Sequence, residues 1–68
     1  MRVLLNGREA DVAPGSTVLT VLSELDLAPD ARGVAVAVDA EVVPRGAWPE
    51  RALEEGARVE VLHAVQGG

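Results

Sequence analysis

The chain has 68 residues, a formal net charge of −5, 49% hydrophobic residues and one aromatic residue, Trp48. A chain of this size forms one domain and buries only about 60% of the surface that its unfolded form exposes, so a deep catalytic cleft is not expected. The negative charge argues against nucleic acid, whose phosphates would repel this surface, and the absence of cysteine excludes disulfides and thiolate metal sites.

The N-terminal residues predict a β-hairpin. Residues 1–5 form a short apolar run that ends at Asn6-Gly7, a dipeptide typical of a two-residue hairpin turn. Residues 8–12 then alternate polar and apolar side chains, as expected for a half-buried return strand.

A helix is predicted next. Ala13-Pro14-Gly15 breaks the second strand, and Ser16 or Thr17 can cap the following segment. From Val18 the apolar spacing becomes helical, and we expect the helix to end near residues 25–27 because Ala28-Pro29 disfavours its continuation.

The second half of the chain predicts three further strands. Residues 34–38 alternate valine and alanine, and residues 39–41 turn the chain into a short strand, Val42-Val43, which Pro44 ends. Residues 45–53 contain two more breakers and predict a loop with one short helical turn. Residues 54–56 turn the chain into the last strand, residues 58–65.

This order predicts an α+β domain, a mixed sheet of about five strands with one main helix packed on one face. The last strand should pair in parallel with the first at the centre of the sheet. The predicted core consists of Val3, Leu5, Val18, Leu22, Leu25, Val36, Val38, Val59 and Val61.

The alternate residues of the same strands should face outward. Small and aliphatic side chains are unusual on a solvated sheet face, and an apolar face on a soluble domain often marks a docking site. Scattered exposed apolar residues are also ordinary, and both interpretations remain open at this point. The outward residues are Leu4, Ala35, Ala37, Leu62 and Ala64.

Gly67-Gly68 follows the last strand. Because glycine has no side chain, these residues can enter a slot only as wide as a backbone. At about 3.3 Å per extended residue, Val65 to Gly68 could carry a terminal carboxylate about 10 Å beyond the fold. The tail is therefore a candidate substrate for a partner enzyme, and the alternative is an inert, frayed terminus.

Few other residues suggest chemistry. His63 is the sole histidine and has no partner set for catalysis or metal binding, so we interpret it as a rim or packing residue. Arg45 and Trp48 could contact a partner together, since both types are enriched in interfaces. We expect Trp48 instead to close the edge of the core, while Arg45 is a candidate partner-binding residue, with pairing to a nearby carboxylate as the alternative. Glu60 is a candidate for an ion pair with a basic partner.

At this point a resemblance is apparent. The element order with its terminal Gly-Gly resembles the ubiquitin-like β-grasp fold, and the stretch Val42-Val43-Pro44-Arg45-Gly46-Ala47-Trp48 resembles the Val-Pro-Arg-x-x-Trp element of the ThiS family of thiamine-biosynthesis sulfur carriers. Leu53, Gly56 and Val59-Glu60-Val61 extend the resemblance along the chain. The chain departs from the family pattern at Asp39, Ala57 and Gln66.

The resemblance implies a carrier rather than an enzyme, with a β-grasp domain over residues 1–66 and a flexible reactive tail over residues 67–68. An adenylyltransferase (ThiF-like) would consume ATP to adenylate the Gly68 carboxylate. A sulfur donor such as a cysteine desulfurase would then supply sulfur for a thiocarboxylate, which a thiazole synthase (ThiG-like) would use. The implied carrier binds no cofactor or metal of its own.

Two alternatives remain. A related carrier could serve molybdopterin synthesis or tRNA thiolation with the same tail chemistry, or the domain could be a non-reactive β-grasp interaction module. No apolar stretch reaches the roughly 20 residues of a membrane helix, and no signal peptide is recognisable, so we expect no membrane association and a cytoplasmic location.

Overall fold

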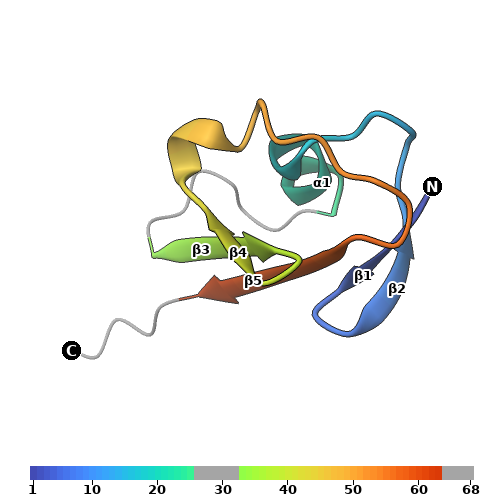
Figure 1. Ribbon diagram of the computed structural model, residues 1–68, viewed down its shortest axis with the longest axis horizontal. Coiled ribbons are helices and arrows are strands. Elements are labelled where there is room, and N and C mark those ends of the chain that lie inside the picture. The colour runs from blue at the N-terminus through green and yellow to red at the C-terminus, as the bar shows by residue number, and fades with distance from the viewer. Residues whose placement is uncertain (26–32, 64–68) are drawn as a thin grey trace.

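The computed structural model describes residues 1–25 and 33–63, and these residues form a five-stranded mixed sheet with one α-helix on one face (Figure 1). The strands lie in the order β2-β1-β5-β3-β4. This confirms the predicted fold class. The elements are β1 (Arg2–Leu5), β2 (Arg8–Asp11), α1 (Val18–Glu24), β3 (Val34–Val38), β4 (Glu41–Val43), the 3-10 helix η1 (Arg45–Ala47) and β5 (Arg58–His63).

The last described strand, β5, occupies the centre of the sheet, between β1 and β3. It pairs in parallel with β1, where Leu5 is opposite Val59, and antiparallel with β3, where Val36 is opposite Val61. The predicted parallel pairing of the first and last strands is therefore confirmed. Figure 1 shows β5 beside β3, and the two strands pair up to His63, the last residue of β5.

The helix begins where the sequence predicted. The Thr17 side chain accepts a hydrogen bond from the backbone N–H of Thr20, and the Thr20 hydroxyl accepts one from the backbone N–H of Thr17. This reciprocal capping satisfies two backbone groups that a helix leaves without partners at its first turn. The helix ends at Glu24, with Leu25 as its C-cap residue, close to the expected end near residues 25–27.

The core lies between α1 and the sheet, and valine is its commonest residue. Most of the predicted core residues are buried, but Leu5 and Leu25 are only partly buried against the core. Each lies at the end of its element, Leu5 before the exposed Asn6-Gly7 turn and Leu25 at the helix C-cap, where neighbouring elements cover it incompletely. The buried hydrophobic residues are Val3, Val12, Val18, Val21, Leu22, Val34, Val36, Val38, Val43, Trp48, Leu53, Ala57, Val59 and Val61.

The segment after β4 closes the core on the α1 side of the sheet. Trp48 is only 2% exposed, and its Nε1–H donates a hydrogen bond to the carbonyl of Val43 at 2.9 Å. The segment also bonds to the start of the helix, because the N–H of Val18 donates to the carbonyl of Arg51. The expectation that Trp48 closes the core edge is confirmed, as is the short helical turn, η1.

Two hairpin turns of the same type join β1 to β2 and β3 to β4. Asn6 and Gly7 have φ values of 49° and 82°, and Asp39 and Ala40 have values of 50° and 69°. Positive φ at both central residues is the geometry of the type I′ turn that suits two-residue hairpins. The second turn corrects one predicted boundary, because Glu41 belongs to β4 and pairs with Val38 rather than lying in the turn.

None of the helices among the described residues is long and apolar enough to cross a membrane.

Candidate functional site

The outward face of the sheet carries the apolar residues that the alternation predicted, as far as the structure describes them. Ala35 lies opposite Leu62 across the β3–β5 pair, and Ala37 lies opposite Glu60. Leu4 lies on β1 opposite Arg58. Leu62 is 64% exposed and Ala35 is also exposed, whereas Leu4 and Ala37 are half-buried. We call the set Leu4, Ala35, Ala37, Glu60 and Leu62 the outer face; Ala64 lies outside the described residues.

Sequence reasoning missed one member of this surface. Val42 is opposite Ala37 in the β3–β4 pair and is 73% exposed, so it extends the outer face onto the edge strand. Val42 and Leu62 are the two large hydrophobic side chains most exposed in the described part of the chain. A two-residue turn at Asp39-Ala40 would have revealed the register, because it places Val42 beside Ala37.

Some of the charged side chains near the outer face form ion pairs with one another. Arg2 contacts Glu9 at 2.9 Å and Asp11 at 3.6 Å, and all three side chains are well exposed. Exposed pairs of this kind contribute little to stability. Within residues 1–25 and 33–63 no ion pair involves Glu60, so its exposed carboxylate can meet a cation on a partner.

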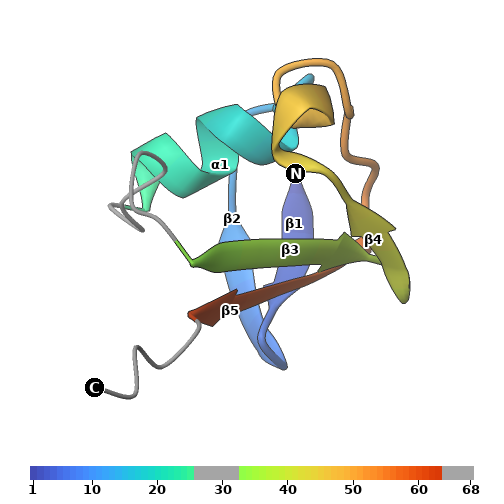
Figure 2. The ribbon, with the colours of Figure 1, turned by 90° about the vertical axis from the view of Figure 1, so that its left-hand side faces the viewer.

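Arg45 lies apart from the outer face. Its element, η1, is on the same side of the sheet as α1 (Figure 2). The Arg45 guanidinium carbon lies 4.6 Å from the centroid of the Trp48 ring, a cation–π contact. Arg45 is exposed while Trp48 is buried, so only Arg45 of this pair presents its side chain to a partner.

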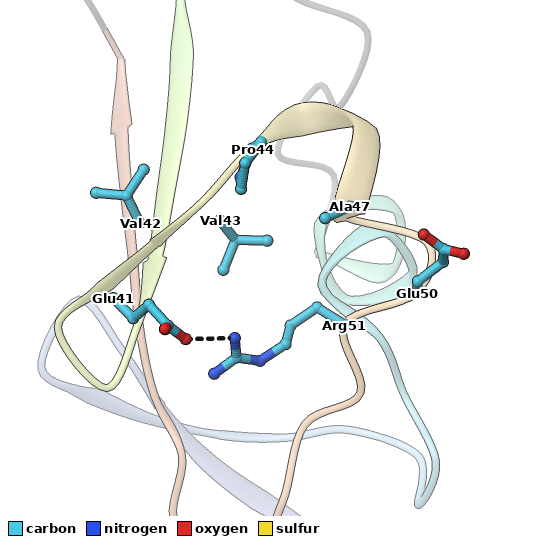
Figure 3. A pocket seen from close by; sticks show the side chains of 7 residues that line it. All are labelled: Glu41, Val42, Val43, Pro44, Ala47, Glu50 and Arg51. Atoms are coloured by element: carbon cyan, nitrogen blue, oxygen red, sulfur yellow. Dashed lines mark hydrogen bonds and ion pairs between the residues drawn. The ribbon is translucent and has the colours of Figure 1, made fainter.

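A hollow lies between β4 and the segment that follows η1 (Figure 3). Val42, Val43, Pro44 and Ala47 line it, and Arg51 joins Glu41 across it through an ion pair of 2.7 Å. The only ionisable groups of its lining are these two residues and Glu50. The Arg51–Glu41 pair links the edge strand to the segment that holds the start of α1, so we interpret the hollow as structural.

The described residues do not meet the requirements of a metal site. They contain no group of three or more histidine, cysteine, aspartate or glutamate residues that could hold a metal ion. The predicted reactive residues Gly67 and Gly68 lie outside the described residues, and the last described residue, His63, pairs through its backbone with Val34. The described part of the site is therefore a strand in the centre of the sheet and an apolar face beside it.

Comparison with known proteins gives one family. The model of the ThiS family matches residues 3–68. The chain is 29% identical over all 68 residues to the sulfur carrier protein ThiS of Escherichia coli, whose whole length it covers. It is also 32% identical over 68 residues to a thiazole synthase of Paramagnetospirillum magneticum, of which it spans only 20%.

Two solved structures of thiamine biosynthesis proteins have a similar fold. The crystal structure of a thiamine biosynthesis protein (ThiS) from Geobacter metallireducens superposes with a TM-score of 0.85, at 33% identity and with full coverage of both chains. A solution structure of a thiamine biosynthesis protein from the same organism gives a TM-score of 0.76 at 30% identity, and 88% of that chain is covered.

Proposed function

The chain belongs to the ThiS family of sulfur carrier proteins, and from this membership we propose that it carries sulfur for the thiazole of thiamine as a thiocarboxylate on Gly68. The observation that carries the proposal is the family match over residues 3–68, which includes the Gly67-Gly68 tail. The fold supports it, because β5 leads from the sheet centre toward that tail (Figure 1).

Each step of the proposed chemistry requires a partner protein or a sulfur donor. A free carboxylate is a poor electrophile, so an adenylating enzyme first joins the Gly68 carboxylate to the AMP portion of ATP and releases pyrophosphate. Hydrosulfide, or a sulfur donor such as a cysteine desulfurase persulfide with a thiol reductant, then displaces AMP and leaves the thiocarboxylate. The carrier contributes the electrophilic carbon and its presentation, and the partner supplies the binding of ATP and the catalysis.

Thiazole synthase is the proposed recipient. The relative from Paramagnetospirillum magneticum is named a thiazole synthase, and the 68 matched residues make up a fifth of it. A second thiazole synthase, from Magnetococcus marinus, matches at 35% identity with the same share of its length. These matches favour a thiazole synthase over the enzymes of molybdopterin synthesis or tRNA thiolation as the protein that takes the sulfur.

The outer face is the proposed docking surface for these partners. Its two most exposed hydrophobic residues, Val42 and Leu62, lie on different strands of one sheet face and would be desolvated together by a partner. Glu60 lies on the same face, on the other side of Ala37 from Val42, and suits a basic residue of the partner. Because the net charge of the chain is −5, a positively charged groove on the partner would also speed the association of the two proteins.

Intact mass tests the proposal. The 68-residue chain is incubated with the cognate adenylating enzyme, ATP and sulfide, and its mass is compared with that of a sample lacking ATP. Replacement of a terminal hydroxyl oxygen by sulfur adds about 16 Da, and this gain should require ATP. A chain that keeps its mass in the complete reaction would instead be an interaction module. Addition of thiazole synthase and its small-molecule substrates should then return the carrier to its original mass.

A further inference from the structure

The central strand β5 pairs with β1 only along its first residues. The β1–β5 pairing covers Leu4 with Arg58 and Leu5 with Val59, and the N–H of Asn6 donates to the carbonyl of Val59 at 2.8 Å. The chain then turns away at Asn6-Gly7. From Val61 onward, no backbone of β1 is available on this side of β5.

The Asn6 side chain takes the place of the missing backbone. Its Oδ1 accepts a hydrogen bond from the N–H of Val61 at 2.8 Å, and its Nδ2 donates one to the carbonyl of Val61 at 3.2 Å. A carboxamide has the same donor and acceptor as a peptide group. The amide of Asn6 thus continues the ladder along β5 by one further pair of hydrogen bonds.

Asn6 suits this role because of its backbone as well as its side chain. Its φ of 49° is in the left-handed region, which asparagine tolerates better than most residues other than glycine. Glycine could form the same turn, but it would leave both backbone groups of Val61 without these partners. The side chain of Asn6 therefore does something that the turn itself does not require.

We propose that Asn6 is a positioning residue for sulfur transfer: its two hydrogen bonds to Val61 fix the direction in which β5 carries the C-terminal tail to the active site of the adenylating enzyme. This inference rests on the proposed function. The tail must bring one carboxylate into a reacting geometry, where a misplacement of about 1 Å can cost as much as about 100-fold in rate.

The fold contains a matched control at the opposite end of the same strand. Asp39 also has a left-handed backbone, with a φ of 50°, in the β3–β4 turn. Its Oδ1 accepts a hydrogen bond from the N–H of Arg58 at 3.0 Å, so Asp39 bonds the start of β5 in the way that Asn6 bonds its later part. Asn6→Gly and Asp39→Gly each keep a turn with positive φ and remove a side chain that bonds β5.

The two variants should therefore differ in transfer even where they lose similar stability. With the cognate adenylating enzyme and ATP, and at a temperature where both variants are fully folded by circular dichroism, Asn6→Gly should lower kcat for carrier adenylation by about tenfold. Its KM should change little, because Glu60 and Leu62 keep their pairing with β3 and the outer face keeps its register. Asp39→Gly should leave both constants close to those of the wild type.

A conservative variant of Asn6 should restore part of the lost kcat. Asn6→Asp keeps an oxygen that accepts from the N–H of Val61 but loses the donor to the Val61 carbonyl, so its kcat should lie between those of Asn6→Gly and the wild type. Amide hydrogen exchange at Val61 should be faster in Asn6→Gly and unchanged in Asp39→Gly.

Three results would overturn the inference: an unchanged kcat in Asn6→Gly, an equal fall in kcat in both glycine variants, or a change in KM alone. The proposed function is tested separately by the wild-type chain. If the wild type gains about 16 Da with ATP and sulfide while Asn6→Gly reacts at the same rate, only the role of Asn6 is wrong.

Discussion

Trp48 shows how one residue can hold together a core that is otherwise aliphatic. It is the single aromatic residue of the chain, it is 2% exposed, and its indole N–H bonds the carbonyl of Val43 at the end of β4. The ring thus fills volume and also satisfies a backbone acceptor near the sheet edge. Arg45 covers the ring from outside at 4.6 Å.

Substitution of Trp48 should separate these two contributions. Trp48→Phe keeps most of the ring but leaves the Val43 carbonyl without its donor, and it should lower the free energy of unfolding by about 2–3 kcal/mol. Trp48→Ala should cost about 3–5 kcal/mol, a large share of the stability of so small a domain. Urea denaturation followed by circular dichroism measures both values. A Trp48→Phe variant as stable as the wild type would show that the indole hydrogen bond contributes nothing.

A substitution of Leu62 tests whether the outer face binds the adenylating enzyme. Leu62→Glu places a charge where a partner would remove water, and it should weaken binding to the adenylating enzyme by tenfold or more, about 1.4 kcal/mol. Ser23→Glu adds the same charge on an exposed residue of α1, on the other side of the sheet, and should have little effect. Calorimetric titration gives the affinities. Equal effects of the two changes would mean that net charge, rather than this face, governs binding.

At the scale of elements, the strands and the helix were predictable because each has a strong local signal. Asn6-Gly7 indicates the first turn, and Thr17 indicates the start of the helix. The register of β4 was not predictable in the same way, because Asp39-Ala40 is an unusual pair for a type I′ turn. Ala40 adopts a φ of 69°, which favours glycine, and a sequence without glycine there does not reveal a two-residue turn.

Ala40→Gly should therefore stabilise the protein. The alanine side chain is strained in the left-handed region, and removal of this strain should exceed the entropy that glycine adds to the unfolded chain, with a net gain of about 1 kcal/mol. For a domain of this size, such a gain raises Tm by about 4–8 °C. Thermal denaturation by circular dichroism measures it, and Ala52→Gly at an exposed residue without positive φ is the control. A lower Tm for Ala40→Gly would contradict the turn geometry.

At the scale of the whole molecule, the sequence indicated more of the fold than of the site. Strand alternation predicted that Leu4, Ala37 and Leu62 share a face, because a period of two holds along each strand. It did not reveal the bonds of Asn6 to Val61, because these join residues that are far apart in sequence and depend on where β1 ends beside β5. Sequence patterns report which face a residue occupies, whereas such a contact depends on the relative stagger of two strands.

The tail provides the first test at this scale. Gly67→Val should slow thiocarboxylate formation more than Gly67→Ala, because a β-branched side chain both restricts the backbone and widens the segment that enters the partner. Neither change should shift Tm, since residues at a chain end contribute few contacts. Rates come from intact mass at successive times. A Gly67→Val variant that reacts as fast as the wild type would mean that the partner's slot is wider than a backbone.

The central claim is that the chemistry takes place at the carboxylate of Gly68, and deletion of Gly68 tests it most directly. The deletion moves the terminal carboxylate back by about 3 Å, a distance comparable to the separation of about 3–3.5 Å at which reacting atoms must meet. With the native adenylating enzyme, ATP and sulfide, the full chain should gain about 16 Da and the shortened chain should keep its mass. A gain of about 16 Da in the chain without Gly68 would contradict the account.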